Sequence, residues 1–389
     1  MLAKLEEIYK NRHQYAKDWK ARTGGKVLGY FYPYVPEEIV YAAGVLPVRI
    51  MGSHEHDNLS AAYIYPMYCP FCRDTLAEGL RGRYSYLDGL ACADTCMHMN
   101  QVFDWFVLNC GIPRRGTFIA NTPANVAGTH ARTYLIKEHL EFKKAIEGWV
   151  GRVLSDKDLD RGIEIMNRNR QLMRQVYETR KREKPPITGA EAQLMVLTSQ
   201  FSDKEEHSAL LEDILNKELP GRNRDRKTGV RLMIVGSEDD DTAFLKMAES
   251  LGVTFVIDDT CVGSRYFWHE VVPGKDRVAA IANHYLDSTP FPTKDWSERR
   301  RFAQVLKLAE EYNVQGVVLA QQKWCDPYEL DIPSLAARLK ERNIPTLFLE
   351  FEPTLPRAPF TTRIEAFVEM LCGDEEGLFA ESSTVKSGS

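Results

Sequence analysis

Short apolar runs alternate with amphipathic stretches through the first third of this chain. The runs predict strands at residues 26–34, 46–52, 61–68, 84–91 and 116–123, and the amphipathic stretches predict helices at 36–44, 73–82 and 92–109. Pro36 stands at the start of one helix and Gly44 just past its end, which is the usual placement of these two residue types. A charged amphipathic helix at residues 1–19 comes first. Strands that alternate with helices indicate a mostly parallel sheet covered on both faces.

The pattern changes to long charged helices from about residue 129 to residue 220. The longest helical pattern covers residues 156–184 and ends at Pro185 and Pro186. This stretch predicts a helical connector between two sheets.

The strand and helix alternation returns after the connector. Strands are predicted at residues 229–237, 253–260, 314–322 and 344–352, with helices at 240–252 and 332–343. The order YLDGLACADTC, helix, GIPRRGTFIAN parallels VQGVVLAQQKWC, helix, NIPTLFLEF, which suggests a weak internal duplication. We therefore expect an α/β protein with an N-terminal α/β domain at 1–128, a helical connector at 129–228 and a C-terminal α/β domain at 229–389.

Composition and charge limit the possible size of the core, the partners and the location of the protein, but they do not indicate a function. With 389 residues, 44% of them hydrophobic, the chain can bury two full cores. The formal net charge of −5 gives no reason to expect nucleic acid or an anionic membrane as a partner. The first residues lack the apolar core of a signal peptide, and no apolar run approaches the roughly 18 residues of a membrane span. The expected location is the cytoplasm.

Six of the eight cysteines follow predicted strand ends or helix starts. Open α/β sheets build their ligand sites at the carboxyl ends of the strands, so thiols from both halves are expected to meet there. The pairs within the CPFC and CADTC segments are each expected to face one way from a single turn or helix start. In a reducing compartment, clustered thiols point to metal ligands or redox groups. The candidate ligands of an iron–sulfur cluster are Cys69, Cys72, Cys92, Cys96, Cys261 and Cys325.

Two other interpretations of the cysteines stay open at this point. The CPFC segment after a strand and before a helix resembles a glutaredoxin redox pair, although that interpretation leaves four thiols unexplained. Zinc would need four closed ligands, usually in short loop-rich modules, whereas these thiols follow strands of large cores. Cys110 and Cys372 are interpreted as packed small apolar side chains.

Other chemistry-bearing residues are weaker candidates. The connector holds basic residues that could meet phosphates or an acidic partner, although a solvated helix face explains them better: Arg168, Arg170, Arg174, Arg180, Lys181 and Arg182. His98 is a candidate neighbour of the cluster or a proton donor, and a packed helix histidine is the simpler interpretation. Glu350 and Glu352 are candidate hydrogen-bond partners near the proposed cleft. No phosphate loop of the GxxxxGK type and no GxGxxG after a strand occurs, so ATP binding by this chain is not expected.

Four segments resemble the 2-hydroxyacyl-CoA dehydratase and benzoyl-CoA reductase family. They are YFYPYVPEEIVYAAGVLPVRIMG, RDTLAEGLRGRYSYLDGLACADTC, DDTCVGSRYF and KWCDPYELDIPSL, and with their order and spacing the resemblance covers nearly the whole chain. The resemblance implies two flavodoxin-like parallel-sheet domains, pairing of two related subunits in a heterodimer, and iron–sulfur clusters between the domains. It also implies electrons from a separate ATP-hydrolysing activator that carries its own cluster and is reduced indirectly by ferredoxin, and an acyl-CoA substrate.

The resemblance implies three ligands in a typical subunit, from the Cys69/Cys72 segment, the Cys92/Cys96 segment and Cys325, around a [4Fe-4S] cluster with one open iron. This sequence doubles the first two and adds Cys261. Six thiolates match a double-cubane [8Fe-9S] cluster, in which each cubane is bound by three cysteines. Cys261 is the least secure of the six.

The expected function follows from that cluster. With every iron bound by sulfur, it would store and relay low-potential electrons, and the thioester chemistry would fall to the companion subunit. We expect the smaller iron–sulfur subunit of an ATP-dependent aromatic acyl-CoA (benzoyl-CoA) reductase, an oxidoreductase. The alternatives are a 2-hydroxyacyl-CoA dehydratase subunit, a lyase with a [4Fe-4S] cluster, and a homodimeric double-cubane reductase.

Overall fold

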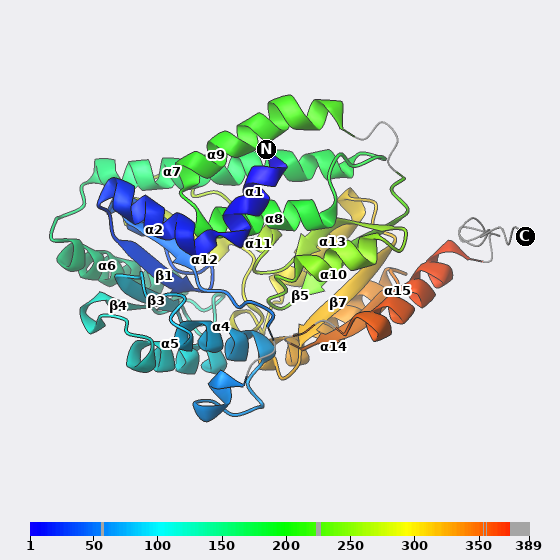
Figure 1. The fold of residues 1–389 in the computed structure, drawn as a ribbon, viewed down its shortest axis with the longest axis horizontal. Helices are drawn as coiled ribbons and strands as arrows, with labels where there is room; N and C mark the ends of the chain where they lie inside the picture. The colour runs from blue at the N-terminus through cyan, green and yellow to red at the C-terminus, as the bar shows by residue number, and fades with distance from the viewer. Residues whose placement is uncertain (56–57, 223–226, 353, 355, 374–389) are drawn as a thin grey trace, which may run out of the picture.

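The protein contains two four-stranded sheets in which every pair of neighbouring strands is parallel (Figure 1). In the computed structural model, the described residues are 1–55, 58–222, 227–352, 354 and 356–373. The strands are β1 (Val27–Phe31), β2 (Leu46–Arg49), β3 (Gly89–Ala93), β4 (Thr117–Ala120), β5 (Val230–Gly236), β6 (Val253–Asp259), β7 (Gly316–Gln322) and β8 (Thr346–Phe351). The predicted fold class, α/β with two flavodoxin-like parallel sheets and a helical connector, is confirmed.

Both sheets have the same strand order. The first runs β2-β1-β3-β4 and the second β6-β5-β7-β8. In each sheet, the side on which the chain adds its next strand switches between two adjacent strands, β1 and β3 in the first sheet and β5 and β7 in the second. Ligands of open α/β sheets bind at such a switch point. The shared order agrees with the internal duplication suggested by the sequence.

The helices cover the faces of both sheets and join them. They are α1 (Leu2–Lys10), α2 (Arg12–Thr23), α3 (Glu37–Ala42), α4 (Pro70–Leu80), α5 (Met97–Asn109), α6 (Ala131–Val150), α7 (Asp156–Glu178), α8 (Gly189–Phe201), α9 (Lys204–Asp213), α10 (Thr242–Glu249), α11 (Ser264–Phe267), α12 (Arg277–Asp287), α13 (Arg300–Glu311), α14 (Asp326–Glu341) and α15 (Arg357–Cys372). In Figure 1 the long helices α7 and α9 run above both sheets. Helix α8 contacts both β2 and β6, so the connector packs on both halves.

Most of the buried apolar residues form one continuous core that includes strands of both sheets. A second core lies on one face of the second sheet, where Phe244, Phe351, Phe360 and Phe367 pack with its strands. Because the larger core crosses between the sheets, the thiols at the sheet edges have a rigid setting. Within the described residues, no helix is both long and apolar enough to span a bilayer.

Three sequence expectations differ from the structure. Residues 61–68 do not form a strand: a short 3₁₀ turn (Leu59–Ala62) and bends occupy this segment, where Pro66 lacks a backbone donor. The predicted helix at 1–19 is divided at Asn11 into α1 and α2. The helix expected from residue 92 begins at Met97, because Gly89–Ala93 complete strand β3. The domain boundaries at 128/129 and 228/229 stay a prediction, and residues 374–389 of the C-terminal domain lie outside the described residues.

Candidate functional site

Three helices begin at a cysteine. Cys69, Cys96 and Cys325 are the residues immediately before the first turns of α4, α5 and α14. Cys72 lies within the first turn of α4. The backbone N–H groups at a helix start carry partial positive charge, which favours thiolates and anionic groups. The helix starts thus favour the thiolate form of these cysteines.

The structure brings these thiols together from both halves of the chain. The neighbouring Cys69 thiol and burial raise the pKa of the Cys72 thiol, and the Cys96 and Cys325 thiols raise it further. Burial followed by the neighbouring Cys69, Cys96 and Cys261 raises the pKa of Cys325. Five of the six predicted ligands, from both halves of the chain, therefore lie near one another.

Cys92 lies differently from the other five. Its residue belongs to β3, between Phe31 of β1 and Ile119 of β4, so the expectation that it shares a helix start with Cys96 is wrong. Its Sγ is 3.7 Å from Asn100 Oδ1 and 3.5 Å from the Ala93 carbonyl oxygen. Burial, followed by Cys96, raises the pKa of the Cys92 thiol. Its role as a ligand stays a prediction.

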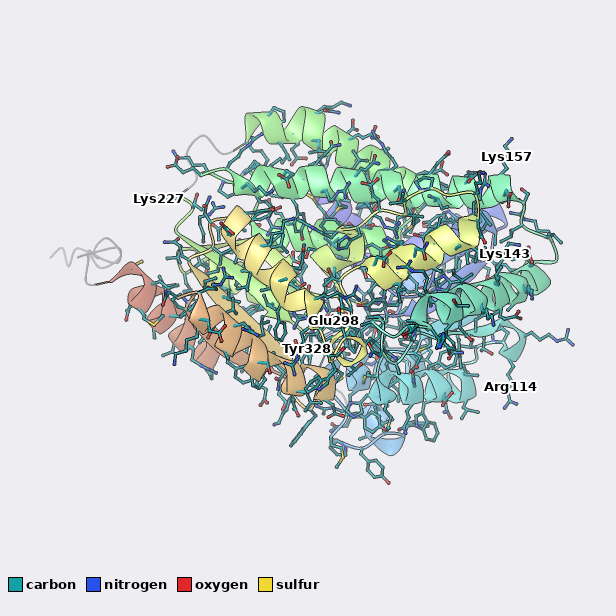
Figure 2. All side chains as sticks on the ribbon, turned by 180° about the vertical axis from the view of Figure 1, so that it is seen from behind. Arg114, Lys143, Lys157, Lys227, Glu298 and Tyr328 are labelled. Carbon is teal, nitrogen blue, oxygen red and sulfur yellow. The ribbon has the colours of Figure 1, made fainter. Side chains whose placement is uncertain are left out.

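Aromatic residues that the sequence did not single out lie beside these thiols. Tyr32 directly follows β1 with a positive φ of 66° and is 5% exposed. Burial, then the thiols of Cys96, Cys261 and Cys325, raises the pKa of its phenol, which places Tyr32 among sulfur atoms from both halves. Tyr328, labelled near the junction of the two halves in Figure 2, has its hydroxyl 3.9 Å from Cys261 Sγ. The sequence signal for both was only an aromatic residue close to a strand end or a cysteine.

A buried ion pair crosses between the sheets beside Cys261. Arg49, at the end of β2, donates to Glu238 Oε1 at 2.9 Å, and the two side chains are 0% and 3% exposed. Glu238 follows β5 and lies close to the Cys261 thiol. Burial raises the pKa of Cys261 to about 12, an effect that the nearby Arg265 guanidinium opposes. Cys261 thus lies among fixed charges of both signs.

His98 lies next to Cys69, as one interpretation of the sequence expected. The neighbouring Cys69 thiol raises the pKa of the His98 imidazole, and burial opposes this effect. Its ring centre is 4.4 Å from that of Tyr68, and Nε2 is 3.8 Å from Asp326 Oδ2. The Cys72 thiol and His98 together lower the pKa of Cys69. His98 is therefore a neighbour of the thiols, and its part in proton transfer stays a hypothesis.

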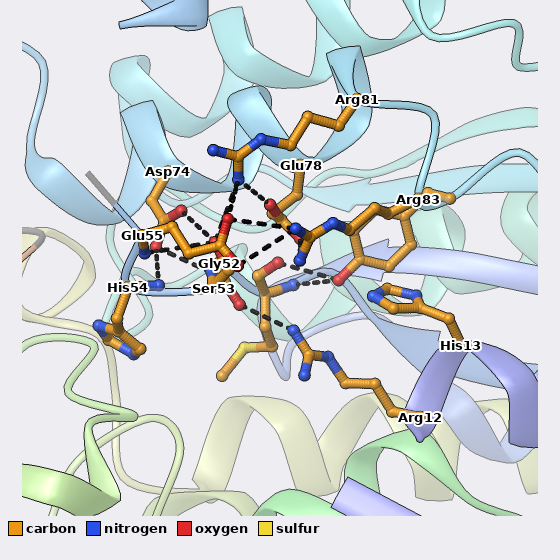
Figure 3. A network of polar contacts seen from close by, with 12 residues as sticks. Arg12, His13, Gly52, Ser53, His54, Glu55, Asp74, Glu78, Arg81 and Arg83 are labelled. Atoms are coloured by element: carbon orange, nitrogen blue, oxygen red, sulfur yellow. Dashed lines mark hydrogen bonds and ion pairs between the residues drawn. The ribbon is translucent and has the colours of Figure 1, made fainter. Parts of the chain in front are cut away.

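A polar network fixes the first turns of α4, and with them Cys69 and Cys72 (Figure 3). Asp74 accepts hydrogen bonds from the backbone N–H groups of Ser53 at 3.0 Å and His54 at 2.8 Å. Arg12 of α2 donates to the carbonyl oxygen of Gly52 at 3.1 Å. A Cβ at Gly52 would lie 2.1 Å from an Asp74 carboxylate oxygen, so this approach requires glycine.

The connector arginines are mostly committed to other partners. Arg170 is 3% exposed and bonds Glu38 at 2.6 Å, while Arg180, 1% exposed, donates to the Phe255 carbonyl oxygen. These two are buried rather than on the solvated face expected from the sequence. Arg168 is exposed and pairs with Glu212. Glu352 accepts from Arg73 of α4 at 3.3 Å and pairs with Lys323 at 2.9 Å, so it links the two halves near the thiols.

The sulfur donors are of the type that binds iron–sulfur clusters. Among the described residues, no three cysteine, histidine or acidic side chains are grouped tightly enough to hold one ion. A single zinc ion needs such a tight group, because all its ligands bind the same atom. In a cubane each thiolate binds a different iron, so its thiolates are spread more widely. Cys69, Cys72, Cys96 and Cys325 lie at helix starts, whereas Cys261 lies in the turn between β6 and α11. Sulfur donors of this kind are the usual ligands of such clusters.

Comparisons with known proteins agree with the resemblance seen in the sequence. A family model described as "2-hydroxyglutaryl-CoA dehydratase, D-component" matches residues 33–371. A benzoyl-CoA reductase subunit of Thauera aromatica is 28% identical over 361 residues, which cover 90% of this chain and 92% of that protein. The (R)-phenyllactyl-CoA dehydratase beta subunit of Clostridium sporogenes is 26% identical over 376 residues, covering 94% and 97%. The beta subunit of (R)-2-hydroxyglutaryl-CoA dehydratase from Acidaminococcus fermentans is 24% identical over 357 residues, covering 90% and 93%.

Proposed function

Because the chain belongs to the 2-hydroxyglutaryl-CoA dehydratase D-component family, we propose that it is the iron–sulfur subunit of an ATP-dependent aromatic acyl-CoA (benzoyl-CoA) reductase. Its relatives are subunits of acyl-CoA reductases and dehydratases, so an enzyme subunit is the broader assignment. The observation that carries the proposal is that thiols from both halves lie near one another. The similarity to a benzoyl-CoA reductase subunit supports the choice of reaction.

The residues of this chain would bind and shield the cofactor. The proposed ligands are Cys69, Cys72, Cys92, Cys96, Cys261 and Cys325, for a double-cubane [8Fe-9S] cluster. The starts of α4, α5 and α14 favour thiolates there. Tyr32 and Tyr328, both buried, keep water from the thiols. When bound, such a cluster supplies electrons at low potential, as its charge and burial dictate.

The proposal includes partners that share the reaction. A related subunit in a heterodimer would present the acyl-CoA thioester to a cluster with an open iron. An ATP-hydrolysing activator, reduced by ferredoxin, would deliver electrons to this chain. The complex would work in the cytoplasm, where thiols stay reduced.

A second candidate is a 2-hydroxyacyl-CoA dehydratase subunit with one [4Fe-4S] cluster. Two observations favour it. Cys92 stands apart in β3, which leaves fewer thiols near one another, and two of the relatives above are dehydratase beta subunits. A homodimeric double-cubane reductase is the remaining alternative.

Iron and sulfide analysis of the anaerobically purified complex tests these candidates. About eight irons per chain would support the double-cubane reductase, and about four would support the dehydratase. Protein with zinc or without metal, and with dithiol activity abolished by Cys69→Ser, would refute both. Chromatographic size and the number of distinct polypeptides in the complex distinguish a heterodimer from a homodimer.

Single variants identify the ligands. Cys325→Ser should lower the iron content strongly, and Cys92→Ser and Cys261→Ser should do so only if these residues bind iron. Cys110→Ser is the matched control, since Cys110 follows α5 and is not a proposed ligand. Normal iron in Cys325→Ser would contradict the proposed site.

A further inference from the structure

Arg265 lies buried beside Cys261 with unused hydrogen-bond donors. It belongs to α11, four residues after Cys261, and its side chain is 3% exposed. One terminal nitrogen donates to the Gly236 carbonyl oxygen at 2.9 Å and to the Tyr328 hydroxyl. Its Nε and Nη1 have no hydrogen-bond acceptor among the described residues. Unmade bonds of a buried cation are costly, so their presence indicates an absent anionic acceptor.

The nearest carboxylate does not supply that acceptor. Asp259 Oδ1 is 3.6 Å from Arg265 Nε, which is an ion pair but too long for a hydrogen bond. The other oxygen of Asp259 accepts from Arg301, which also pairs with Asp331. Asp259 is thus shared between two guanidinium groups, and the charge of Arg265 is only partly balanced.

The Cys261 thiol beside Arg265 lies close to positive charge. Cys261 is 1% exposed and lies near two guanidinium groups, those of Arg265 and Arg49. Arg49 Nε also lacks a hydrogen-bond acceptor within the described part of the chain. The Glu238 carboxylate also lies near Cys261, but it is paired with Arg49. The remaining donors of Arg265 therefore suit a group with negative charge spread over several sulfur atoms.

We propose that Arg265 is a positioning residue for the cofactor: it supplies positive charge and two N–H donors to the anionic iron–sulfur cluster beside Cys261. The inference rests on the proposed function and deepens it. Positive charge near a cluster stabilises its more negative, reduced form, so Arg265 raises the reduction potential of the site. Arg265 would in this way help to determine the reduction potential of the cluster.

Redox titration of the anaerobic complex, followed by electron paramagnetic resonance, tests the proposal. Arg265→Gln removes the charge and should shift the midpoint potential to more negative values while iron is retained. Arg265→Lys keeps the charge but loses the planar fork, so its shift should be smaller. The matched control is Arg231→Lys, since Arg231 lies at the other end of β5 and donates to the carbonyl oxygens of Tyr312 and Arg180.

The outcomes separate the two proposals. Native iron content with an unchanged potential in Arg265→Gln overturns the role of Arg265 and leaves the proposed function standing. Unmodified protein that binds no iron overturns the proposed function itself. If Arg265→Gln does not fold, Arg265→Met, which also removes the charge, decides: a potential equal to that of the native protein, with full iron content, overturns the inference. An equal shift in Arg231→Lys would also overturn it, since the effect would then not be local.

Discussion

At the scale of single residues, buried charges constrain the space around the thiols as much as the thiols do. Arg49 reaches from the end of β2 to Glu238 after β5, and neither side chain meets solvent to any useful extent. A buried ion pair is weak evidence for added stability, but it is costly to break, because the remaining charge has no water. The loss of stability on removal of this pair therefore measures how much it contributes to joining the two sheets.

Arg49→Ala should lower the free energy of unfolding by about 3–5 kcal/mol, because the Glu238 carboxylate would stay buried without its cation. Arg168→Ala is the control, since it removes an exposed ion pair with Glu212 and should change that free energy by about 0–1 kcal/mol. Urea denaturation followed by circular dichroism measures both. Similar small losses in the two variants would show that the pair does not join the sheets.

His54 gives the stability a pH dependence. Burial lowers its pKa, but Asp240, at 3.0 Å, outweighs burial and raises it to about 10, with smaller contributions from Asp241 and Asp74. The unfolded value is about 6.5. The ion pair therefore stabilises fully below pH about 6.5, and its contribution is lost as the pH rises through about 10.

His54→Asn should abolish this dependence. Asparagine tolerates the positive φ of 59° at this position, so the change tests charge rather than backbone strain. The difference in unfolding free energy between native protein and variant should be largest near pH 6 and should shrink towards pH 10. Denaturation across that range measures it, with His130→Asn, at an exposed position, as the control. A difference that stays constant with pH would contradict the assignment.

At the scale of elements, glycine determines how closely two helices approach. Gly162 of α7 faces α3, and a Cβ there would lie 2.2 Å from the Glu38 carbonyl oxygen. Gly148 of α6 is also helical, but a Cβ there would meet nothing within 4 Å. The two glycines thus have opposite roles, although both stand in helices.

Gly162→Ala should lower the unfolding free energy by about 1–3 kcal/mol, because α7 must move away from α3. Gly148→Ala should raise it by about 0.4–1 kcal/mol, because alanine restricts the unfolded chain without a clash. Thermal denaturation shows both effects as shifts of Tm in opposite directions. A gain in Tm for Gly162→Ala would mean that the helices tolerate a wider separation.

The element scale also shows what the pattern of apolar residues could and could not predict. It located the eight strands of the described residues. Continuous buried runs such as β3 and β7 are typical of parallel strands that are covered on both faces. The pattern failed at residues 61–68, whose aromatic and β-branched composition imitates a strand although no sheet edge accepts them. It also misjudged Cys92, since only Asp94, Thr95 and Cys96 separate β3 from α5, and this short connection did not mark where the strand ends.

At the scale of the whole molecule, the two halves bring together thiols that neither half holds alone. Cys69, Cys72 and Cys96 come from the first half, and Cys261 and Cys325 come from the second. Sequence spacing indicated that thiols of both halves lie near one another, because each follows a strand or begins a helix, and their role as ligands stays a prediction. It did not predict Arg49 with Glu238, because their contact depends on how the sheets meet and leaves no local signal.

Removal of the proposed cluster should lower Tm and loosen the junction of the sheets. A ligand that binds only the folded protein adds its binding free energy to stability, and this one would bind residues of both halves. Treatment of the anaerobic complex with an oxidant and a chelator, followed by calorimetry and hydrogen exchange, measures the change. Exchange should increase mainly at the starts of α4, α5 and α14, and an unchanged Tm would contradict a cluster that joins the halves.

The distance along the chain between the cysteines has a consequence for biosynthesis. Cys69 leaves the ribosome well before Cys325, and at roughly 5–20 residues per second the delay is on the order of tens of seconds. During this interval the early thiols have no counterparts from the second half, so they stand open to oxidation. For the proposed cluster, delivery of iron and sulfide would therefore follow translation of α14, and the cell would have to protect the nascent thiols until then.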